Sequence, residues 1–334
     1  MNIKNYHNIN RFSVAPMLDR TDRHCRYFYR LLTKKTLLYT EMVTTSSIIY
    51  GNIKKVLAYN AEEHPLALQL GGNKPKELAY CAKIAQKYNY DEINLNIGCP
   101  SNRVKNGCFG ASLMREASLV ADCIKVMQDA VTIPITIKTR IGIDNDDSYD
   151  FLVNFIDTII TNSPCRLFII HARKAWLSGL TPKQNREIPP LNYKRVYQLK
   201  KYFPHLIIVL NGGIKTINEA KKHLQYLDGV MIGREVYRNP CLLMQVDCKI
   251  FEENCNLIFD KISIIKGMYP YIHKEVNNGA FLGHIVRPML GIFSGVSGSR
   301  QWRRYLSENA YKKGADISIV QKALKFIINN NLLD

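Results

Sequence analysis

Eight short apolar runs, separated by stretches with helical spacing, constrain the fold of this chain more than any other feature. The runs are typical of buried strands and span residues 12–16, 37–42, 66–70, 92–96, 134–139, 167–171, 207–211 and 229–233. Strands that alternate with helices form parallel βα units, and eight units over roughly 240 residues predict a (β/α)8 TIM barrel. A doubly wound open sheet is the alternative, but no Gly-x-Gly-x-x-Gly motif follows an early strand.

The segments between the runs support this α/β prediction. Apolar residues recur every three or four positions in residues 76–88, 116–130, 148–162 and 218–226, as in helices that pack on a sheet. After Asn239-Pro240 only helical patterns follow, in residues 260–277, 281–293, 299–313 and 318–330. We therefore predict a barrel domain of residues 1–245 and a small all-helical domain of residues 246–334.

The composition is that of a globular protein, with 46% hydrophobic and 22% charged residues. No apolar run approaches the ~20 residues of a membrane span, and residues 1–10 are polar, which favours a cytoplasmic protein. Nine cysteines at irregular spacing, without a Cys-x-x-Cys pair, argue against a zinc site and against a disulfide framework. We expect them to be reduced, and we expect no metal.

The formal net charge of +18 favours a polyanionic partner, and nucleic acid is the usual candidate. The charge has a local maximum in the predicted helix of residues 299–313. There Arg300, Arg303 and Arg304 share a helix face, with Trp302 and Tyr305 between them. Arginines beside aromatic rings suit RNA, although a solvated face with Trp302 as an anchor to neighbouring helices is the alternative.

Polar residues stand at the carboxyl ends of the predicted strands, where a barrel of this kind assembles its active site. They include Glu41, Gln69, Asn96 with Cys99, Lys138 with Arg140, His171, Asn211 and Arg234. Each polar group costs stability there unless it finds a partner, so the set indicates a function. Taken singly, Lys138 is as readily an ion-pair partner of Glu41, and His171 a satisfied buried histidine.

Two glycine motifs predict a phosphate-binding site at the last two strands. Asn211-Gly-Gly213 and Gly233-Arg234 leave backbone amides uncovered, and Arg234 adds a fork of donors. Gln69 suits a ring edge of alternating carbonyl and N–H groups, Lys138 suits an anionic ring, and His171 suits ring or phosphate. These requirements describe flavin mononucleotide (FMN).

Cys99 follows the fourth predicted strand, in the sequence Gly98-Cys99-Pro100, and is placed to react from a loop. The alternative is a small buried hydrophobic residue, which is the commonest fate of a free cysteine. The charged, aromatic loop of residues 173–190 after the sixth strand favours a substrate contact.

These motifs together resemble the tRNA-dihydrouridine synthases, and the loop after the sixth strand is similar to that of the bacterial A-type branch. The resemblance rests on Ala15-Pro-Met17, Leu95–Pro100 with Gly110-Ala111, Lys138-Thr-Arg140, His171-Ala-Arg173, Asn211-Gly-Gly213, Asp228–Arg234 and Trp302–Tyr305. It implies an FMN-containing barrel, an NADPH-dependent oxidoreductase that reduces D-loop uridines of tRNA near positions 20 and 20a. No protein partner is evident, and we expect a monomer.

The resemblance also implies residue roles. Cys99 is the expected general acid. The expected FMN contacts are Pro16, Met17, Gln69, Lys138, His171, Asn211, Gly212, Gly213, Gly233 and Arg234, and the expected tRNA contacts are Asn96, Lys183, Arg186, Arg300 and Arg303.

The chemistry fits these roles. Reduction of the 5,6 double bond of uracil needs a hydride at one carbon and a proton at its neighbour, and an ordinary thiol is still protonated at neutral pH. Asn96 is expected to bind the edge of a flipped base, and Arg140 or Arg173 to stabilise the uracil carbonyl. Two alternatives remain: a flavin enzyme acting on a free pyrimidine, as dihydroorotate dehydrogenases do, and a tRNA-binding protein without catalysis.

Overall fold

The computed structural model describes residues 8–101, 107–253 and 260–331, and within them eight parallel strands form a closed barrel in sequential order. The strands are β1 (Phe12–Val14), β2 (Leu37–Thr44), β3 (Leu66–Gly71), β4 (Glu92–Ile97), β5 (Ile135–Arg140), β6 (Leu167–His171), β7 (Ile207–Asn211) and β8 (Gly229–Ile232). The last strand pairs with the first and closes the barrel, with Ser13 opposite Met231. The predicted TIM barrel is confirmed.

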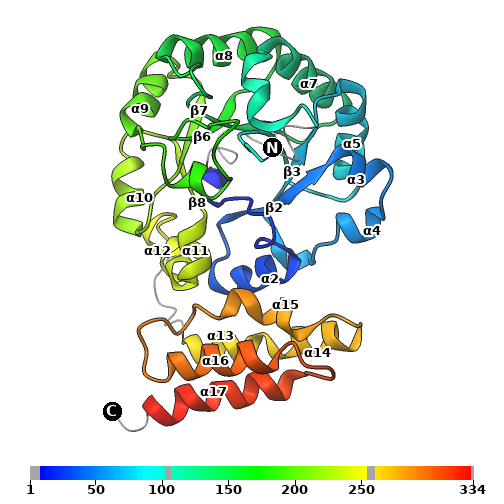
Figure 1. Ribbon diagram of the computed structural model, residues 1–334, viewed down its shortest axis with the longest axis vertical. Helices are drawn as coiled ribbons and strands as arrows, with labels where there is room; N and C mark the ends of the chain where they lie inside the picture. The colour runs from blue at the N-terminus through cyan, green and yellow to red at the C-terminus, as the bar shows by residue number, and fades with distance from the viewer. Residues whose placement is uncertain (1–7, 102–106, 254–259, 332–334) are drawn as a thin grey trace. The chain divides into compact units, whose positions relative to one another are not determined.

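Helices surround the strands, as Figure 1 shows for the barrel. They are α3 (Thr45–Ile49), α4 (Ile53–Val56), α5 (Pro75–Lys87), α7 (Ala117–Ala130), α8 (Tyr149–Asn162), α9 (Tyr193–Tyr202) and α10 (Ile217–His223), with the 3-10 helices η1 (Ala61–Glu63), η2 (Gly110–Arg115) and η3 (Gln184–Arg186). Local sequence explains where they begin. Ser148 caps α8 by accepting from the Phe151 N–H, and Thr216 forms a capping box with Glu219 at α10.

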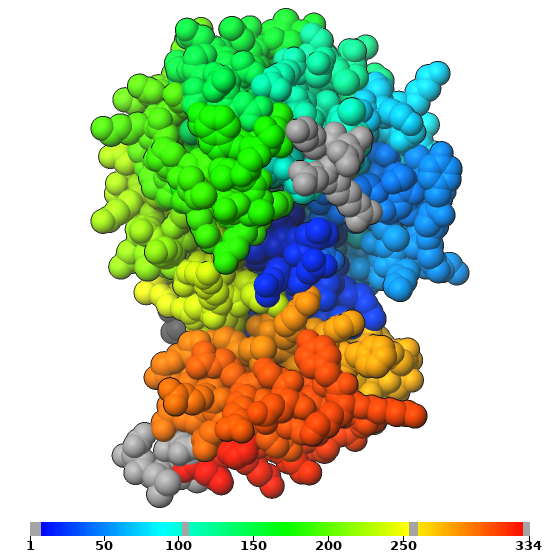
Figure 2. Space-filling view, viewed as in Figure 1, coloured from blue at the N-terminus to red at the C-terminus, as the bar shows by residue number. Residues whose placement is uncertain are grey.

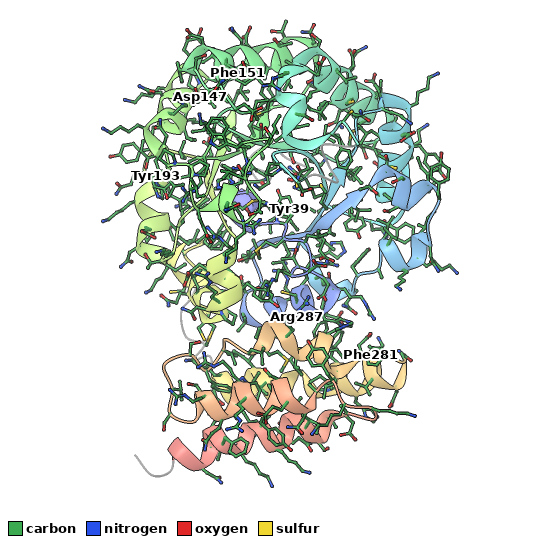
Figure 3. All side chains as sticks on the ribbon, viewed as in Figure 1. Tyr39, Asp147, Phe151, Tyr193, Phe281 and Arg287 are labelled. Carbon is green, nitrogen blue, oxygen red and sulfur yellow. The ribbon has the colours of Figure 1, made fainter. Side chains whose placement is uncertain are left out.

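The barrel interior follows from the alternation of side chains along each strand. One hydrophobic cluster of its inward residues comprises Ala15, Leu37, Tyr39, Ala67, Leu167, Ile169, Ile207, Val209 and Met231. Figure 3 labels Tyr39 in the middle of the barrel. On β4 and β5 the same alternation brings Glu92, Asn94 and Thr136 inside, where they are fully buried.

A second compact unit contains residues 20–35 together with residues 234–334. Its elements are α2 (Arg23–Leu32), α11 (Arg234–Arg238), η4 (Pro240–Gln245), α12 (Val246–Lys249), α13 (Lys261–Gly267), α14 (Tyr269–Asn277), α15 (Leu282–Val286), η5 (Arg287–Met289), α16 (Ser299–Asn309) and α17 (Ile317–Asn331). The late part of the chain is helical, as predicted. The domain boundary after residue 245 stays a prediction.

Helix α2 follows β1 in the chain but is held by residues more than 200 positions later. The Asp247 carboxylate accepts from the Lys34 N–H at 2.6 Å and from the Thr33 hydroxyl at 2.5 Å. His24 Nδ1 lies 2.7 Å from the Tyr271 hydroxyl, and Arg23 pairs with the buried Glu275. The second unit is therefore built from two separate segments of sequence.

Prolines break two of the predicted helices. The stretch 260–277 forms α13 and α14, separated at Met268, because Pro270 cannot supply an N–H to a continuous helix. The stretch 281–293 holds only α15 and the short η5, which contains Pro288. Periodicity alone therefore overstated the length of these helices.

Seven cysteines in the described part of the chain carry free thiols: Cys25, Cys81, Cys99, Cys108, Cys123, Cys165 and Cys241. Cys248 is disulfide-bonded, so the expectation of nine reduced cysteines is wrong for this residue. Spacing in the sequence could not show which sulfur atoms lie close together. Cys255 lies outside the described residues. Among the described helices, none has the length and hydropathy to cross a membrane.

Candidate active site

Cys99 lies just beyond the carboxyl end of β4 and is half-buried. Its thiol is 3.5 Å from the Ser101 hydroxyl, and its carbonyl accepts from the Ala111 N–H at 3.0 Å. The predicted position at a strand exit is thus observed, and the alternative of a fully buried thiol is not. This thiol can approach a ligand bound at the carboxyl ends of the strands.

Asn96 holds the backbone on which Cys99 stands. Its Oδ1 accepts from the N–H groups of Gly98, at 3.1 Å, and Cys99, at 3.0 Å. Its Nδ2 donates to Gln69 Oε1 at 2.8 Å. The structure therefore brings together three of the predicted site residues through two strands.

Lys138 and Asn211 form a second pair of predicted site residues. Lys138 Nζ donates to Asn211 Oδ1 at 2.9 Å, rather than forming the ion pair with Glu41 that the sequence left open. Asn211 Nδ2 in turn donates to the Met231 carbonyl at 2.9 Å. Burial, followed by the positive charge of Arg140, lowers the pKa of Lys138 to about 7. A bound anion would favour the charged amine.

The backbone directly after β7 makes a tight turn that only glycine allows. Gly212 and Gly213 have φ values of +114° and +77°, which disfavour other residues. A Cβ on Gly212 would lie 2.6 Å from His171 Cδ2, and one on Gly213 would lie 2.4 Å from Leu191 Cδ1. The Tyr193 hydroxyl, which the sequence did not predict, donates to the Gly212 carbonyl at 2.8 Å and supports this turn.

The remaining predicted cofactor residues follow β1 and β8. Pro16 and Met17 are half-buried directly after β1, and a Cβ on Gly233 would lie 3.4 Å from Met17 Sδ. Gly233 is thus close to Met17, as a shared site requires. Arg234 begins α11 and belongs to the second unit, so its part in the site stays a prediction.

Arg140 is buried and spans two loops of the site. Its Nε donates to the Gly98 carbonyl at 2.8 Å, and one terminal nitrogen donates to the carbonyls of Lys174, at 3.0 Å, and Asn185, at 3.2 Å. Burial lowers the pKa of Arg140 to about 10, so the guanidinium remains charged at neutral pH. This cation stabilises the turn that carries Cys99 and the long loop after β6.

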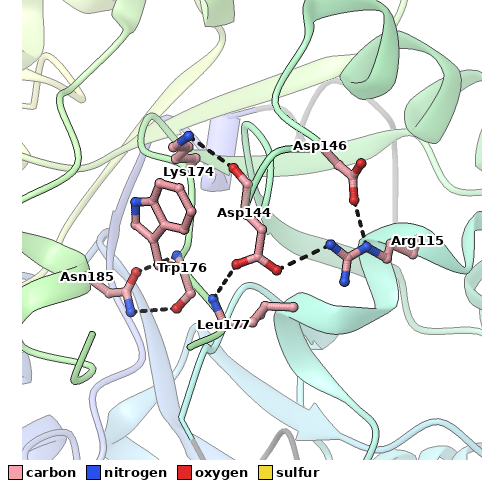
Figure 4. A network of polar contacts seen from close by, with 7 residues as sticks. All are labelled: Arg115, Asp144, Asp146, Lys174, Trp176, Leu177 and Asn185. Carbon is pink, nitrogen blue, oxygen red and sulfur yellow. Dashed lines mark hydrogen bonds and ion pairs between the residues drawn. The ribbon is translucent and has the colours of Figure 1, made fainter. Parts of the chain in front are cut away.

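A polar network fixes the loop after β6 (Figure 4). The Asp144 carboxylate accepts from the Leu177 N–H at 2.8 Å and from Arg115 at 3.2 Å. Asn185 exchanges two hydrogen bonds with the backbone of Trp176, at 2.8 and 2.9 Å. The loop is therefore anchored by Asp144, which follows β5 in the chain. Figure 2 shows the green surface that this part of the chain forms on the barrel unit.

Four of the five predicted RNA contacts, Lys183, Arg186, Arg300 and Arg303, are exposed, whereas Asn96 is buried at the end of β4. Lys183 and Arg186 flank the fully buried Asn185, so the loop presents both cations to solvent. On α16, Arg300 and Arg303 are exposed, and Arg304 pairs with Glu308 at 2.7 Å. Both pairs of cations are thus exposed on the surface of their units.

Trp302 does not share this exposure. It is completely buried and packs edge-on against Phe293, with ring centroids 5.1 Å apart. The anchoring alternative is therefore correct for this residue, and stacking of Trp302 on RNA is excluded.

The sequence reasoning missed the buried polar residues Glu92, Asn94 and Thr136 inside the barrel. Their signal was present, since polar residues occupy every second position of Glu92–Ile97 and of residues 136–140. Asn185 was also not predicted as a site residue, although it begins the segment Asn185–Pro190 of the loop that resembles the A-type branch. Among the residues described, no cluster suited to a metal ion occurs.

The family model and the curated proteins similar to this chain identify the same family of enzymes. The chain matches the family described as dihydrouridine synthase (Dus) over residues 13–328. It is 63% identical over 317 residues to the tRNA-dihydrouridine(20/20a) synthase of Escherichia coli (strain K12), covering 95% of this chain and 91% of that one. The protein of the same name from Salmonella typhimurium (strain LT2) is 62% identical over 317 residues, with 95% of each chain covered.

A further relative and a solved structure extend the comparison. The tRNA-dihydrouridine(20/20a) synthase of Vibrio parahaemolyticus is 60% identical over 314 residues, covering 94% of this chain and 96% of that one. A 2-naphthoyl-CoA reductase complex superposes with a TM-score of 0.54 at 13% identity, covering 71% of this chain and 49% of that one. The latter similarity concerns the fold alone.

Proposed function

This chain belongs to the dihydrouridine synthase family, and from that premise we propose that it reduces the 5,6 double bond of tRNA uridines, at D-loop positions around 20 and 20a. The observation that carries the proposal is the bond from the Cys99 N–H to the side-chain oxygen of Asn96, which holds a thiol at the carboxyl end of β4, next to the strand that carries Lys138. The tRNA positions follow the names of relatives at 60–63% identity.

Enzymes of this family are flavin-dependent, and we propose FMN as the flavin. The residues present fit such a group. Lys138 offers an amine whose pKa of about 7 would rise beside an anion. Gly212 and Gly213 form a turn with φ values of +114° and +77°, in which no Cβ covers the backbone N–H groups that an anion would need. Gln69, His171 and Asn211 would contact the flavin with Pro16, Met17, Gly233 and Arg234. When bound, the flavin would supply the hydride.

Cys99 supplies the proton in this proposal. Its thiol would face the uracil and transfer its proton to the carbon next to the one that receives the hydride, which completes the reduction of the double bond. Asn96 would hydrogen-bond the base edge after the nucleotide has left its stack. Arg140 remains positively charged and buried, so it favours negative charge on the uracil carbonyl.

For the RNA, we propose that Lys183 and Arg186 on the loop after β6, and Arg300 and Arg303 on α16, contact tRNA phosphates. All four are exposed, and Asn185 and Trp302 fix the segments that carry them. NADPH as the reductant, a monomeric state and a cytoplasmic location complete the proposal.

The decisive experiment supplies the purified flavin-loaded protein with NADPH and tRNA transcribed without modifications. Dihydrouridine should form near position 20, as read by reverse transcription after alkaline treatment, whereas free uridine and orotate should not be reduced. Reduction of the free bases would favour the free-pyrimidine alternative. A protein that binds tRNA but never retains a flavin would favour the alternative without catalysis.

The assignment of the RNA contacts has its own test. Replacing Arg300 or Arg303 with Ala should weaken tRNA binding roughly threefold to tenfold, which is the scale of one lost phosphate contact. Arg304→Ala on the same helix is the matched control, because Glu308 already pairs with that charge. Equal losses for all three variants in a filter-binding titration would argue against specific roles for Arg300 and Arg303.

A further inference from the structure

One sector of the barrel interior is polar, although barrel interiors are usually filled by branched apolar side chains. Glu92 and Asn94 on β4, Thr136 on β5 and Gln69 on β3 are at most 1% exposed. Burial of these groups is costly unless every one has a partner, so their presence needs an explanation beyond packing.

The four residues form one continuous chain of hydrogen bonds that ends at the active site. Thr136 Oγ1 donates to Glu92 Oε1 at 2.8 Å, and Asn94 Nδ2 donates to Thr136 Oγ1 at 2.8 Å. Gln69 Nε2 donates to Asn94 Oδ1 at 2.8 Å, and Asn96 Nδ2 donates to Gln69 Oε1 at 2.8 Å. Asn96 Oδ1 then accepts from the Cys99 N–H.

The direction of this chain is fixed at its Cys99 end. The N–H groups of Gly98 and Cys99 only donate, so the side-chain oxygen of Asn96 must face them and its Nδ2 must donate to Gln69. That choice sets the amide of Gln69, then that of Asn94, and leaves the hydroxyl hydrogen of Thr136 for Glu92.

We infer that the chain from Glu92 through Thr136, Asn94 and Gln69 holds Asn96 so that it keeps its oxygen on Cys99 and offers an N–H to the substrate. The inference rests on the proposed function for the identity of that substrate. One Nδ2 hydrogen of Asn96 goes to Gln69, and among the described residues no acceptor takes the other. The substrate atom opposite must therefore be an acceptor, a carbonyl oxygen of uracil. Gln69 likewise keeps one N–H for the flavin. Glu92, Thr136 and Asn94 are positioning residues.

Thr136→Val tests this inference, because it removes the hydroxyl and keeps the shape of the side chain. Asn94 then loses the acceptor that orients it, and the amide of Gln69 can rotate, so that Asn96 loses the acceptor that holds its Nδ2. The rate at which tRNA reoxidises the reduced bound flavin should fall about tenfold, on the scale of one lost buried hydrogen bond. The Kd for tRNA should stay within about twofold, because the phosphate contacts are unchanged.

Two variants serve as controls. Thr136→Ser restores the hydroxyl and should recover the wild-type rate, which a purely steric role would not predict. Tyr39→Phe removes a second donor to Glu92 Oε1, 2.6 Å away, without interrupting the chain, and should remain close to wild type. A Thr136→Val protein that matches wild type in reoxidation rate overturns the inference, as does a Thr136→Ser protein as slow as Thr136→Val.

A readout that does not depend on tRNA separates this inference from the proposed function. The flavin-free Thr136→Val protein should bind FMN several-fold more weakly than Thr136→Ser, because Gln69 is no longer fixed. If the wild-type protein binds FMN but fails to reduce tRNA, the proposed function is wrong, and this comparison of affinities still decides the role of the chain.

Asn94→Asp tests the same inference if the Thr136→Val protein does not fold. The new carboxyl group can accept from Gln69, but it can donate to Thr136 only when protonated. Reoxidation should therefore slow as the pH rises through the pKa of this introduced carboxyl group, relative to the wild-type pH profile. Parallel pH profiles for the two proteins would overturn the inference.

Discussion

At the scale of single residues, Lys138 is the most strongly perturbed base of the site. Its amine donates to Asn211 within the barrel, where burial and the charge of Arg140 oppose protonation. The pKa of about 7 lies well below the ordinary lysine value of about 10.4. Between these two pH values the unfolded chain binds more protons than the folded one, so the free energy of unfolding rises with pH.

This shift predicts a pH-dependent stability of the flavin-free protein. The penalty for burying the charge is fully present below pH 7 and is relieved as the pH approaches 10. Wild type should gain stability relative to Lys138→Met by up to about 1.4 kcal/mol per pH unit between about pH 7.5 and 9. Urea unfolding at several pH values measures this difference. The lost bond to Asn211 adds a constant offset, so parallel pH dependences would contradict the prediction.

Cys99 is expected to act in catalysis and not in binding. Cys99→Ala should lower dihydrouridine formation roughly 10²–10⁴-fold, which is the usual contribution of a positioned acid. The flavin absorption should be unchanged, because the thiol does not belong to the expected flavin contacts. Cys108→Ala is the matched control, since Cys108 is an exposed free thiol. Full activity of Cys99→Ala would remove this residue from the mechanism.

The residues at the strand ends were predictable because parallel strands carry their ligands at one end, and this needs only the order of elements. The chain of Glu92, Asn94 and Thr136 was not predicted, because only the last residues of each strand were considered. Asn94 and Thr136 lie two residues before Asn96 and Lys138 on the same strands. The distinction between exposed Arg303 and buried Trp302, one position apart, required knowledge of how α16 packs against Phe293. Charge patterns in a sequence do not contain that information.

At the scale of elements, the carboxyl end of α2 depends on the distant carboxylate of Asp247. Asp247 accepts from the Thr33 hydroxyl and from the N–H groups of Lys34 and Lys35, all at the end of α2. Asp247→Ala should lower the free energy of unfolding by about 1–3 kcal/mol, because the buried Thr33 hydroxyl loses its acceptor. A shift in the thermal melting temperature measures this loss.

Glu253→Gln provides the comparison for that measurement. Glu253 pairs with Lys35 at 2.9 Å, but both side chains are about half exposed, at 51% and 49%. Exposed pairs contribute on the order of 0–1 kcal/mol, so the melting temperature should change little. If both variants melted alike, the assigned role of Asp247 at the end of α2 would be wrong.

Strand boundaries were predicted to within a few residues because most strands are buried along their whole length, as β3, β4, β7 and β8 are, and a strand buried on both faces forms a short run rich in apolar residues. Helix ends were harder to predict. The sequence 260–277 keeps a helical period across Met268, yet Pro270 ends the hydrogen-bond ladder there. Membership of α2 in the second unit could not be predicted, because its contacts with Asp247, Tyr271 and Glu275 join residues more than 200 positions apart.

At the scale of the whole molecule, the net charge of +18 should govern the affinity for tRNA. Each phosphate contact releases counterions, so the logarithm of the association constant falls linearly with the logarithm of the salt concentration. Four contacts, from Lys183, Arg186, Arg300 and Arg303, predict a slope of about −3. Binding titrations between roughly 50 and 300 mM KCl measure it. A double Arg300→Ala/Arg303→Ala variant should have a slope about half as steep, and an unchanged slope would refute these contacts.

The second unit is built from two segments far apart in the sequence, and this affects the chain while it is being synthesised. A ribosome that adds about 5–20 residues per second completes residues 20–35 roughly 12–48 s before their partners Tyr271 and Glu275 are added. During synthesis α2 lacks these partners. The flanking strands β1 and β2 belong to the barrel unit, whose other strands are made before the late helices. Newly made chains should therefore be most vulnerable to proteases and most attractive to chaperones at this helix, until the end of translation releases the residues that cover it.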